Sequence, residues 1–204
     1  MKRMLCLAVF VSCFSIFVSV AAEADEVAAK PQLQLTIGHM FDISEDVNGF
    51  TNGIFLYDLV NDYPVAFGYA GPVIEVEELN VYALMVLMAE PIGTSIGPSL
   101  WLEYKGLFLE YDHYETWLAA SHEEGAEAPP SSYYGLAEYS HAITDDISVG
   151  VAYEDIGYYQ DDDSFQRAYG CFVQFGDFKT LVAYDETPLV PGNEYIIFRF
   201  KYGI

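Results

Sequence analysis

The sequence predicts an all-β fold, an antiparallel transmembrane β-barrel of about ten strands. First, apolar and polar residues alternate with a period of two in many segments, which is the pattern of a strand with one apolar and one polar face. Second, many of these segments run about nine to eleven residues, the length that a tilted strand needs to cross a membrane. Third, tight turns alternate with longer acidic connections in the C-terminal half, which is typical of an up-and-down barrel.

The composition favours one domain of strands and turns and excludes some partners. The chain has 204 residues, 16% of them aromatic, with 17 Tyr and 16 Gly. Its formal net charge of −23 comes from 31 acidic and 8 basic residues. This balance argues against nucleic acid, whose phosphates need Lys and Arg. It fits divalent cations that bridge acidic loops, and it fits a saline habitat equally well.

Residues 1–24 are expected to form a cleaved secretory signal, which leaves residues 25–204 as the barrel domain. Lys2 and Arg3 precede an apolar run, and Ala22-Glu23-Ala24 has the small-x-small pattern of a cleavage site. An uncleaved anchor and a lipoprotein modified at Cys13 are the alternatives. After cleavage Cys171 is the only cysteine, so we expect no internal disulfide and interpret it as a small apolar strand residue.

Eleven segments read as candidate strands, and tight turns or acidic loops separate them. The clearest hairpin has its turn at Lys105-Gly106, and Val81–Ala89 is apolar on both faces, which fits a fully buried strand or a short buried helix. Single-chain bacterial barrels use an even number of strands. The sequence therefore predicts ten strands, with eight or twelve as alternatives. The one segment in excess of ten is expected to lie between Phe50 and Ala89. The segments are 32–41, 50–59, 65–70, 81–89, 95–104, 107–117, 133–142, 147–155, 166–175, 178–185 and 194–204.

The last segment, EYIIFRFKYGI, has an apolar face that ends in a belt of aromatic residues and a polar face that carries Arg199 and Lys201. It resembles the C-terminal strand of small bacterial outer-membrane β-barrel proteins, although that class usually ends in an aromatic residue. The resemblance implies export to the outer membrane of a Gram-negative bacterium and contact with outer-membrane lipid. It also implies recognition by periplasmic chaperones and by the barrel-insertion machinery. The insertion signal would be Phe198, Phe200, Tyr202 and Ile204.

If the apolar faces point to lipid, the polar faces line the interior of the barrel. We expect the lumen-lining charges to pair with one another, because an unpaired buried charge is costly. The alternative is a narrow pore that prefers cations, since acidic rings favour cations. These lumen-lining residues are Glu103, Glu110, Asp112, Glu138, Glu154, Arg199 and Lys201.

The sequence predicts a non-enzymatic barrel, structural or porin-like, without cofactor or metal. Asp112-His113 beside Glu110 is the best catalytic candidate, but adjacent strand residues point to opposite faces. The GxSxG, HExxH and CxxC patterns are absent, and Asp161-Asp162-Asp163 lacks the spacing of a calcium loop. A soluble periplasmic β-sheet ligand-binding protein and a membrane-embedded lipid-modifying hydrolase or protease are the alternatives.

Overall fold

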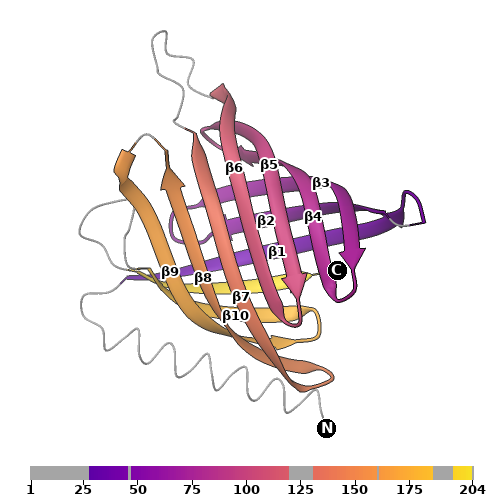
Figure 1. Cartoon of the computed structure of the whole chain (residues 1–204). Helices are drawn as coiled ribbons and strands as arrows, with labels where there is room; N and C mark the ends of the chain where they lie inside the picture. The colour runs from indigo at the N-terminus through magenta and orange to yellow at the C-terminus, as the bar shows by residue number, and fades with distance from the viewer. Residues whose placement is uncertain (1–27, 46, 120–130, 160, 186–194, 204) are drawn as a thin grey trace.

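A computed structural model shows eleven strands closed into a barrel (Figure 1). It describes residues 28–45, 47–119, 131–159, 161–185 and 195–203, so the expected signal peptide lies outside the described residues. No helix in these ranges is long and apolar enough to span a membrane. The strands are β1 (Ala28–Asp42), β2 (Asn48–Asp58), β3 (Tyr63–Val76), β4 (Leu79–Glu90), β5 (Gly93–Tyr104), β6 (Leu107–Ala119), β7 (Ser132–Thr144), β8 (Ile147–Tyr158), β9 (Asp161–Phe175), β10 (Phe178–Asp185) and β11 (Tyr195–Gly203).

The prediction of ten strands, all antiparallel, is wrong by one strand and one pairing. Each strand pairs antiparallel with the next along the chain, from β1 to β11. The barrel then closes through a parallel pairing of β1 with β11, in which Ala28 lies opposite Tyr195 and Thr36 opposite Gly203. The physical reason is parity, because in an up-and-down barrel with an odd number of strands the first and last strands run in the same direction.

The expected surplus strand does not exist, because the stretch between Phe50 and Ala89 forms parts of three full strands. Gly71-Pro72 lies inside β3 and does not end it. The pairing of β3 with β4 skips these two residues and resumes at Val73. Since proline has no N–H to give to a neighbouring strand, a local gap in the ladder is the expected accommodation.

Two-residue turns occur at both ends of the barrel. The turns 77–78, 105–106, 145–146 and 176–177 lie at the end where β11 finishes, together with the longer connection 43–47. The two-residue turn 91–92 lies at the opposite end. Lys105 and Gly106 have φ of 48° and 84°, as a tight hairpin turn that matches the twist of its strands requires. The tight turns predicted in the C-terminal half are present, but the predicted division into an end of tight turns and an end of longer connections holds only in part.

The outer face is apolar along nearly the whole wall. Val151 and Ile37, for example, expose 58% and 54% of their surfaces. Since neighbouring strand residues alternate between faces, the exposed series and the buried series mark the outside and the inside. Large exposed apolar residues on the strands include Leu33, Leu35, Ile37, Phe55, Ile74, Met85, Leu87, Ile96, Leu100, Tyr111, Tyr139, Val149, Val151, Tyr153, Tyr169 and Tyr202.

The inner face is mixed, with apolar clusters beside buried polar groups. One cluster lines β3 to β6 and includes Tyr69, Val73, Tyr82, Leu84, Val86, Trp101 and Tyr114. A second lines β8 to β11 and consists of Ala152, Ala168, Phe172, Leu181, Ala183 and Ile197. The two-sided apolar run is strand β4, with Leu84 inside and Met85 outside. The buried polar residues are Asn52, Ser95, Ser99, Glu110, Asp112, Glu154, Lys179 and Asp185.

Candidate functional site

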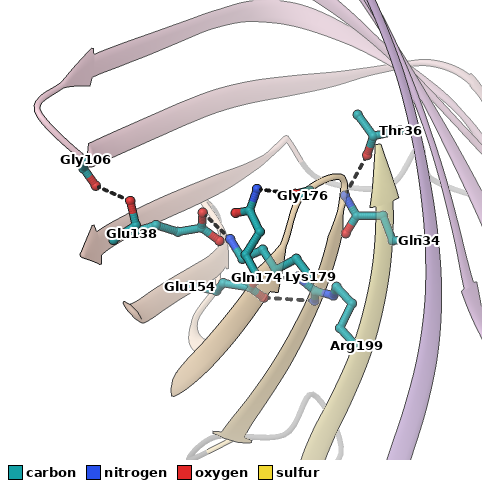
Figure 2. A network of polar contacts seen from close by, with 10 residues as sticks. Gln34, Thr36, Gly106, Glu138, Glu154, Gln174, Gly176, Lys179 and Arg199 are labelled. Atoms are coloured by element: carbon teal, nitrogen blue, oxygen red, sulfur yellow. Dashed lines mark hydrogen bonds and ion pairs between the residues drawn. The ribbon is translucent and has the colours of Figure 1, made fainter. Parts of the chain in front are cut away.

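The barrel interior holds an ion pair between strands that are not neighbours. Arg199 of β11 donates from Nη1 and Nη2 to the two carboxylate oxygens of Glu154 on β8, the Nη2 to Oε2 distance being 3.0 Å. Arg199 Nε also donates to Gln32 Oε1 at 2.9 Å, across the β1–β11 seam. β10 and β9 separate β11 from β8 in the wall, so the pair reaches across the curved interior (Figure 2). The guanidinium thereby ties the closing strand to the wall.

A second interior ion pair follows the same pattern one strand along. Lys179 of β10 lies 2.5 Å from Glu138 Oε2 of β7, and Figure 2 shows the two side chains pointing toward each other. The ammonium also lies 3.8 Å from the ring centroid of Phe172, a favourable cation–π position. Both partners are largely buried, with 10% and 17% of their side chains exposed, so neither charge is compensated mainly by water.

Glu110 and Asp112 form an acidic pair on β6. They are two residues apart and therefore point to the same face, and they expose 8% and 0% of their surfaces. The Tyr69 hydroxyl lies 2.9 Å from Asp112 Oδ2 and 3.2 Å from Glu110 Oε1. The Tyr114 hydroxyl donates to Asp112 Oδ2 at 2.6 Å. We call Glu110, Asp112, Tyr69, Tyr114 and Ser99, which lies opposite Asp112 on β5, the acidic cluster.

Trp101 is the centre of an aromatic group that fills one side of the interior. Its ring lies 4.8 Å from Tyr69 and 5.6 Å from Phe50, measured between centroids. Tyr82 and Phe108 pack against it at 5.8 and 5.6 Å. Aromatic pairs at such separations are favourable beyond their buried area. Since Phe50 comes from β2 and Trp101 from β5, the group reaches across part of the interior and narrows any axial path.

The remaining predicted lumen residues lie apart from these pairs. Glu103 is exposed and accepts hydrogen bonds from Tyr82 at 3.2 Å and Asn80 at 3.4 Å. Lys201 lies opposite Lys179 in the β10–β11 register. Within the described residues, no carboxylate lies at ion-pair distance from Lys201. The sequence thus indicated the interior carboxylates but not their grouping.

Lys179 is an interior residue that the sequence analysis missed. One face of β10 carries two apolar residues between two charges, Lys179, Leu181, Ala183 and Asp185, and the other face consists of Phe178, Thr180, Val182 and Tyr184. The sequence feature that could have identified Lys179 as an interior residue is that Lys179 and Asp185 lie on the same face of the strand. The structure places that face inside the barrel.

The catalytic candidate is divided between two faces. Asp112 is buried inside, whereas His113 lies on the outer face, with Nδ1 3.0 Å from the Tyr159 hydroxyl and Nε2 3.5 Å from Glu115. Tyr159, in the connection after β8, also lies 2.5 Å from the Tyr111 hydroxyl. Burial, together with the hydrogen bond to Tyr111, raises the pKa of Tyr159 to about 12, so it remains a neutral hydroxyl at physiological pH.

The predicted insertion signal lies on β11. Phe198, Phe200 and Tyr202 share one face, opposite to the face of Arg199, and Tyr202 exposes 46% of its surface. Ile204 lies outside the described residues. Asp161–Asp163, expected in a loop, begin strand β9.

The part of the chain that the structure describes contains no group of three or more His, Cys, Asp or Glu side chains able to hold a metal ion. No protein-family model, curated protein or solved structure matches this chain.

Proposed function

We propose that this chain is a non-enzymatic β-barrel protein of a bacterial outer membrane, with a filled interior that makes it a structural barrel. The observation that carries the proposal is the division of the wall into an apolar outer face and an inner face that contains buried charges. A soluble barrel needs the reverse arrangement, because apolar side chains stabilise a fold in water only when folding removes them from the solvent.

The strand lengths support a membrane-spanning wall. β5 has 12 residues, which corresponds to a strand about 40 Å long, and a tilt of about 40° leaves about 30 Å along the barrel axis. That height matches the hydrocarbon thickness of a bilayer, roughly 30 Å. The outward residues Met85, Leu100 and Val151 lie within the central parts of their strands, where they would contact the lipid chains.

The filled interior favours a structural barrel over an open pore. The Arg199–Glu154 and Lys179–Glu138 pairs and the aromatic group around Trp101 all project inward. The second candidate is a narrow path for small cations, which the acidic pair Glu110 and Asp112 favours because carboxylates attract cations. A wide diffusion pore fits neither observation.

Two experiments on the full-length protein test this proposal. Alkaline carbonate extraction of a bacterial envelope is expected to leave the protein in the membrane fraction, and its appearance in the soluble fraction would refute the membrane location. Planar-bilayer recording of the refolded protein is expected to show no stable large conductance. Steady steps of porin size would refute the filled interior, whereas very small cation-selective steps would favour the second candidate.

A further inference from the structure

We propose that the open edge of β1, residues 37–42, binds an extended polypeptide strand of another protein, one in which apolar or aromatic residues alternate with Lys or Arg. The bound strand would add to the barrel wall at the place where β11 stops. This binding surface is independent of the proposed membrane role, because it follows from the pairing of the strands alone.

β1 is longer than the strand that closes the barrel against it. β11 pairs with β1 from Ala28 to Thr36, and Gly203 lies opposite Thr36. β1 continues to Asp42 and is held on its other side by β2, with Asp42 opposite Asn48. None of the described strands pairs with the open side of β1 beyond Thr36. Figure 1 shows the β1–β2 hairpin, in indigo, extending past the C-terminus.

The backbone of this edge offers donors and acceptors to a further strand. At the two ends of the β1–β2 ladder, Leu59 N donates to Pro31 O at 3.0 Å and Ile43 N donates to Val47 O at 3.1 Å. Both bonds use odd-numbered residues of the first chain segment, and successive residues of a strand direct their backbone groups to opposite sides. The even-numbered residues therefore direct their N–H and C=O groups to the open side. These residues are Gly38, Met40 and Asp42.

The open edge lacks the features that usually keep a strand edge unpaired. Exposed edges are normally protected by charged residues, proline or a bulge, yet residues 37–41 contain no Lys, Arg, Asp, Glu or Pro. Ile37, Met40 and Phe41 expose 54%, 43% and 44% of their surfaces. The Phe41 ring covers Gly49 on β2, where an added Cβ would collide with it. An ordered, apolar and unpaired edge is the kind of surface to which an extended peptide adds as a strand.

The surroundings of the open edge are acidic, which favours a basic partner strand. Gly203 N donates to Asp177 O at 2.9 Å, and Gly176 N donates to Asp146 O at 3.0 Å. The two turns that contain these aspartates therefore lie beside the end of β11. Asp146 and Asp177 are exposed, as is Asp42 on the edge itself. A strand that continued beyond β11 would lie between the edge and these turns, where Lys or Arg would meet carboxylates.

β11 shows the chemistry of the strand with which β1 already pairs. Arg199 and Lys201 lie on one face of β11, and Phe198, Phe200 and Tyr202 lie on the other. A partner strand with the same alternation would extend both faces of the wall along β1. The partner is therefore expected to be an extended segment with alternating aromatic and basic residues.

The probe for the test is a fluorescein-labelled peptide with the sequence of residues 195–203, YIIFRFKYG, added to the full-length refolded barrel. We expect saturable binding, seen as a rise in fluorescence anisotropy. A peptide with Glu in place of both cations is expected to bind about tenfold more weakly, since attraction to the carboxylates becomes repulsion. Absence of saturable binding, or equal binding of the two peptides, would overturn the proposal.

Met40 allows the backbone contact to be tested separately from the side chain. Met40→Pro removes an N–H that points to the open side and leaves the ladder with β2, and such an edge tolerates proline. Met40→Ala removes the side chain and keeps the N–H, so it is the matched control. We expect Met40→Pro to bind the peptide about tenfold more weakly than Met40→Ala. Partition of the peptide into detergent affects both variants equally. Equal affinities of the two variants would overturn the proposal.

Two further measurements decide the outcome even if Met40→Pro does not fold. Asp42→Lys reverses the charge on the edge and is expected to weaken binding about two- to fivefold, so an unchanged affinity would contradict this location of the binding surface. Sedimentation of the wild type without peptide tests a second copy of this chain as the occupant. A monomer is expected, and a dimer that Asp42→Lys or Met40→Pro dissociates would overturn the choice of partner.

Discussion

At the scale of single residues, the ion pairs inside the barrel are the contacts that matter most for its stability. A buried ion pair contributes little compared with a well-packed apolar pair, but removing one partner leaves the other buried and uncompensated. Arg199 carries more weight than an isolated cation, because it bonds to both Glu154 and Gln32. Its interior position could be predicted from the alternation in the last strand. Its partner could not, because nothing in the sequence says which strands face each other across the interior.

Arg199→Ala is expected to destabilise the folded barrel by about 3–5 kcal/mol, because it leaves the nearly buried Glu154 without its cation. The free energy of unfolding from urea titration of the refolded protein measures the effect. Lys105→Ala is the matched control. Lys105 pairs with Glu78 at 2.5 Å, but both side chains are more than half exposed, so the expected loss is at most about 1 kcal/mol. Equal losses in the two variants would contradict the buried pairing.

Gly106→Ala is expected to destabilise the β5–β6 hairpin by about 1–2 kcal/mol. Gly106 has φ of 84°, and a Cβ there would lie 2.5 Å from the backbone oxygen of Ser140, so the substitution strains the turn. Gly68→Ala is the control, because a Cβ at Gly68 meets nothing within 4 Å, and it should be neutral or slightly stabilising. Urea unfolding of both variants provides the comparison, and a neutral Gly106→Ala would rule out the strained turn.

At the scale of elements, strand positions were easier to predict than strand faces. The segments with clean alternation, such as 147–155, have the predicted phase, with Val151 outside and Glu154 inside. β3 shows the limit, since Phe67 and Tyr69 point inward while the small Ala66 and Gly68 are exposed. Hydropathy alone would have placed the aromatic face in lipid. The aromatic residues are inside because Trp101 and its neighbours form an apolar group there, a contact between strands distant in sequence.

If the barrel is embedded in a membrane as proposed, Val151→Arg is expected to destabilise it by about 2–4 kcal/mol, because the substitution places a charge at mid-height on the outer face. Ile143→Arg is the matched control. Both residues expose 58% of their surfaces, but Ile143 lies beside the turn after β7, where the expected cost is at most about 1 kcal/mol. Refolding into lipid vesicles across a urea series measures both. In a soluble barrel both substitutions would stay within about 0.5 kcal/mol, so that result would contradict the lipid contact.

For the whole molecule, the closure is the feature that the sequence did not reveal. Alternation and turns predict an up-and-down barrel. However, one segment that is wrongly divided or merged changes the number of strands from even to odd, or from odd to even. With eleven strands, β1 must run parallel to β11. Without β1, the remaining ten strands would be antiparallel throughout, whereas the sequence analysis had placed the surplus strand between Phe50 and Ala89. The position of β1 therefore distinguishes the two architectures.

A cysteine pair tests the closure directly. Leu35 lies opposite Tyr202 in the parallel seam, and both side chains are exposed. In a background with Cys171→Ser, the pair Leu35→Cys and Tyr202→Cys is expected to form a disulfide on mild oxidation, seen as a mobility shift on a non-reducing gel. Leu35→Cys with Tyr139→Cys, which lies on β7, should not crosslink. Absence of the seam disulfide would favour a ten-stranded barrel with β1 displaced.

The most direct test of the membrane barrel is the gel mobility in SDS of the detergent-refolded protein, unboiled against boiled. If the proposed membrane location is right, the closed wall with its apolar outer face, tied inside by Arg199–Glu154 and Lys179–Glu138, should resist SDS until it is heated. We expect a compact, fast-running band that shifts to the position of the unfolded chain on boiling. Identical mobility of the two samples, together with solubility of the folded protein without detergent, would contradict the membrane barrel.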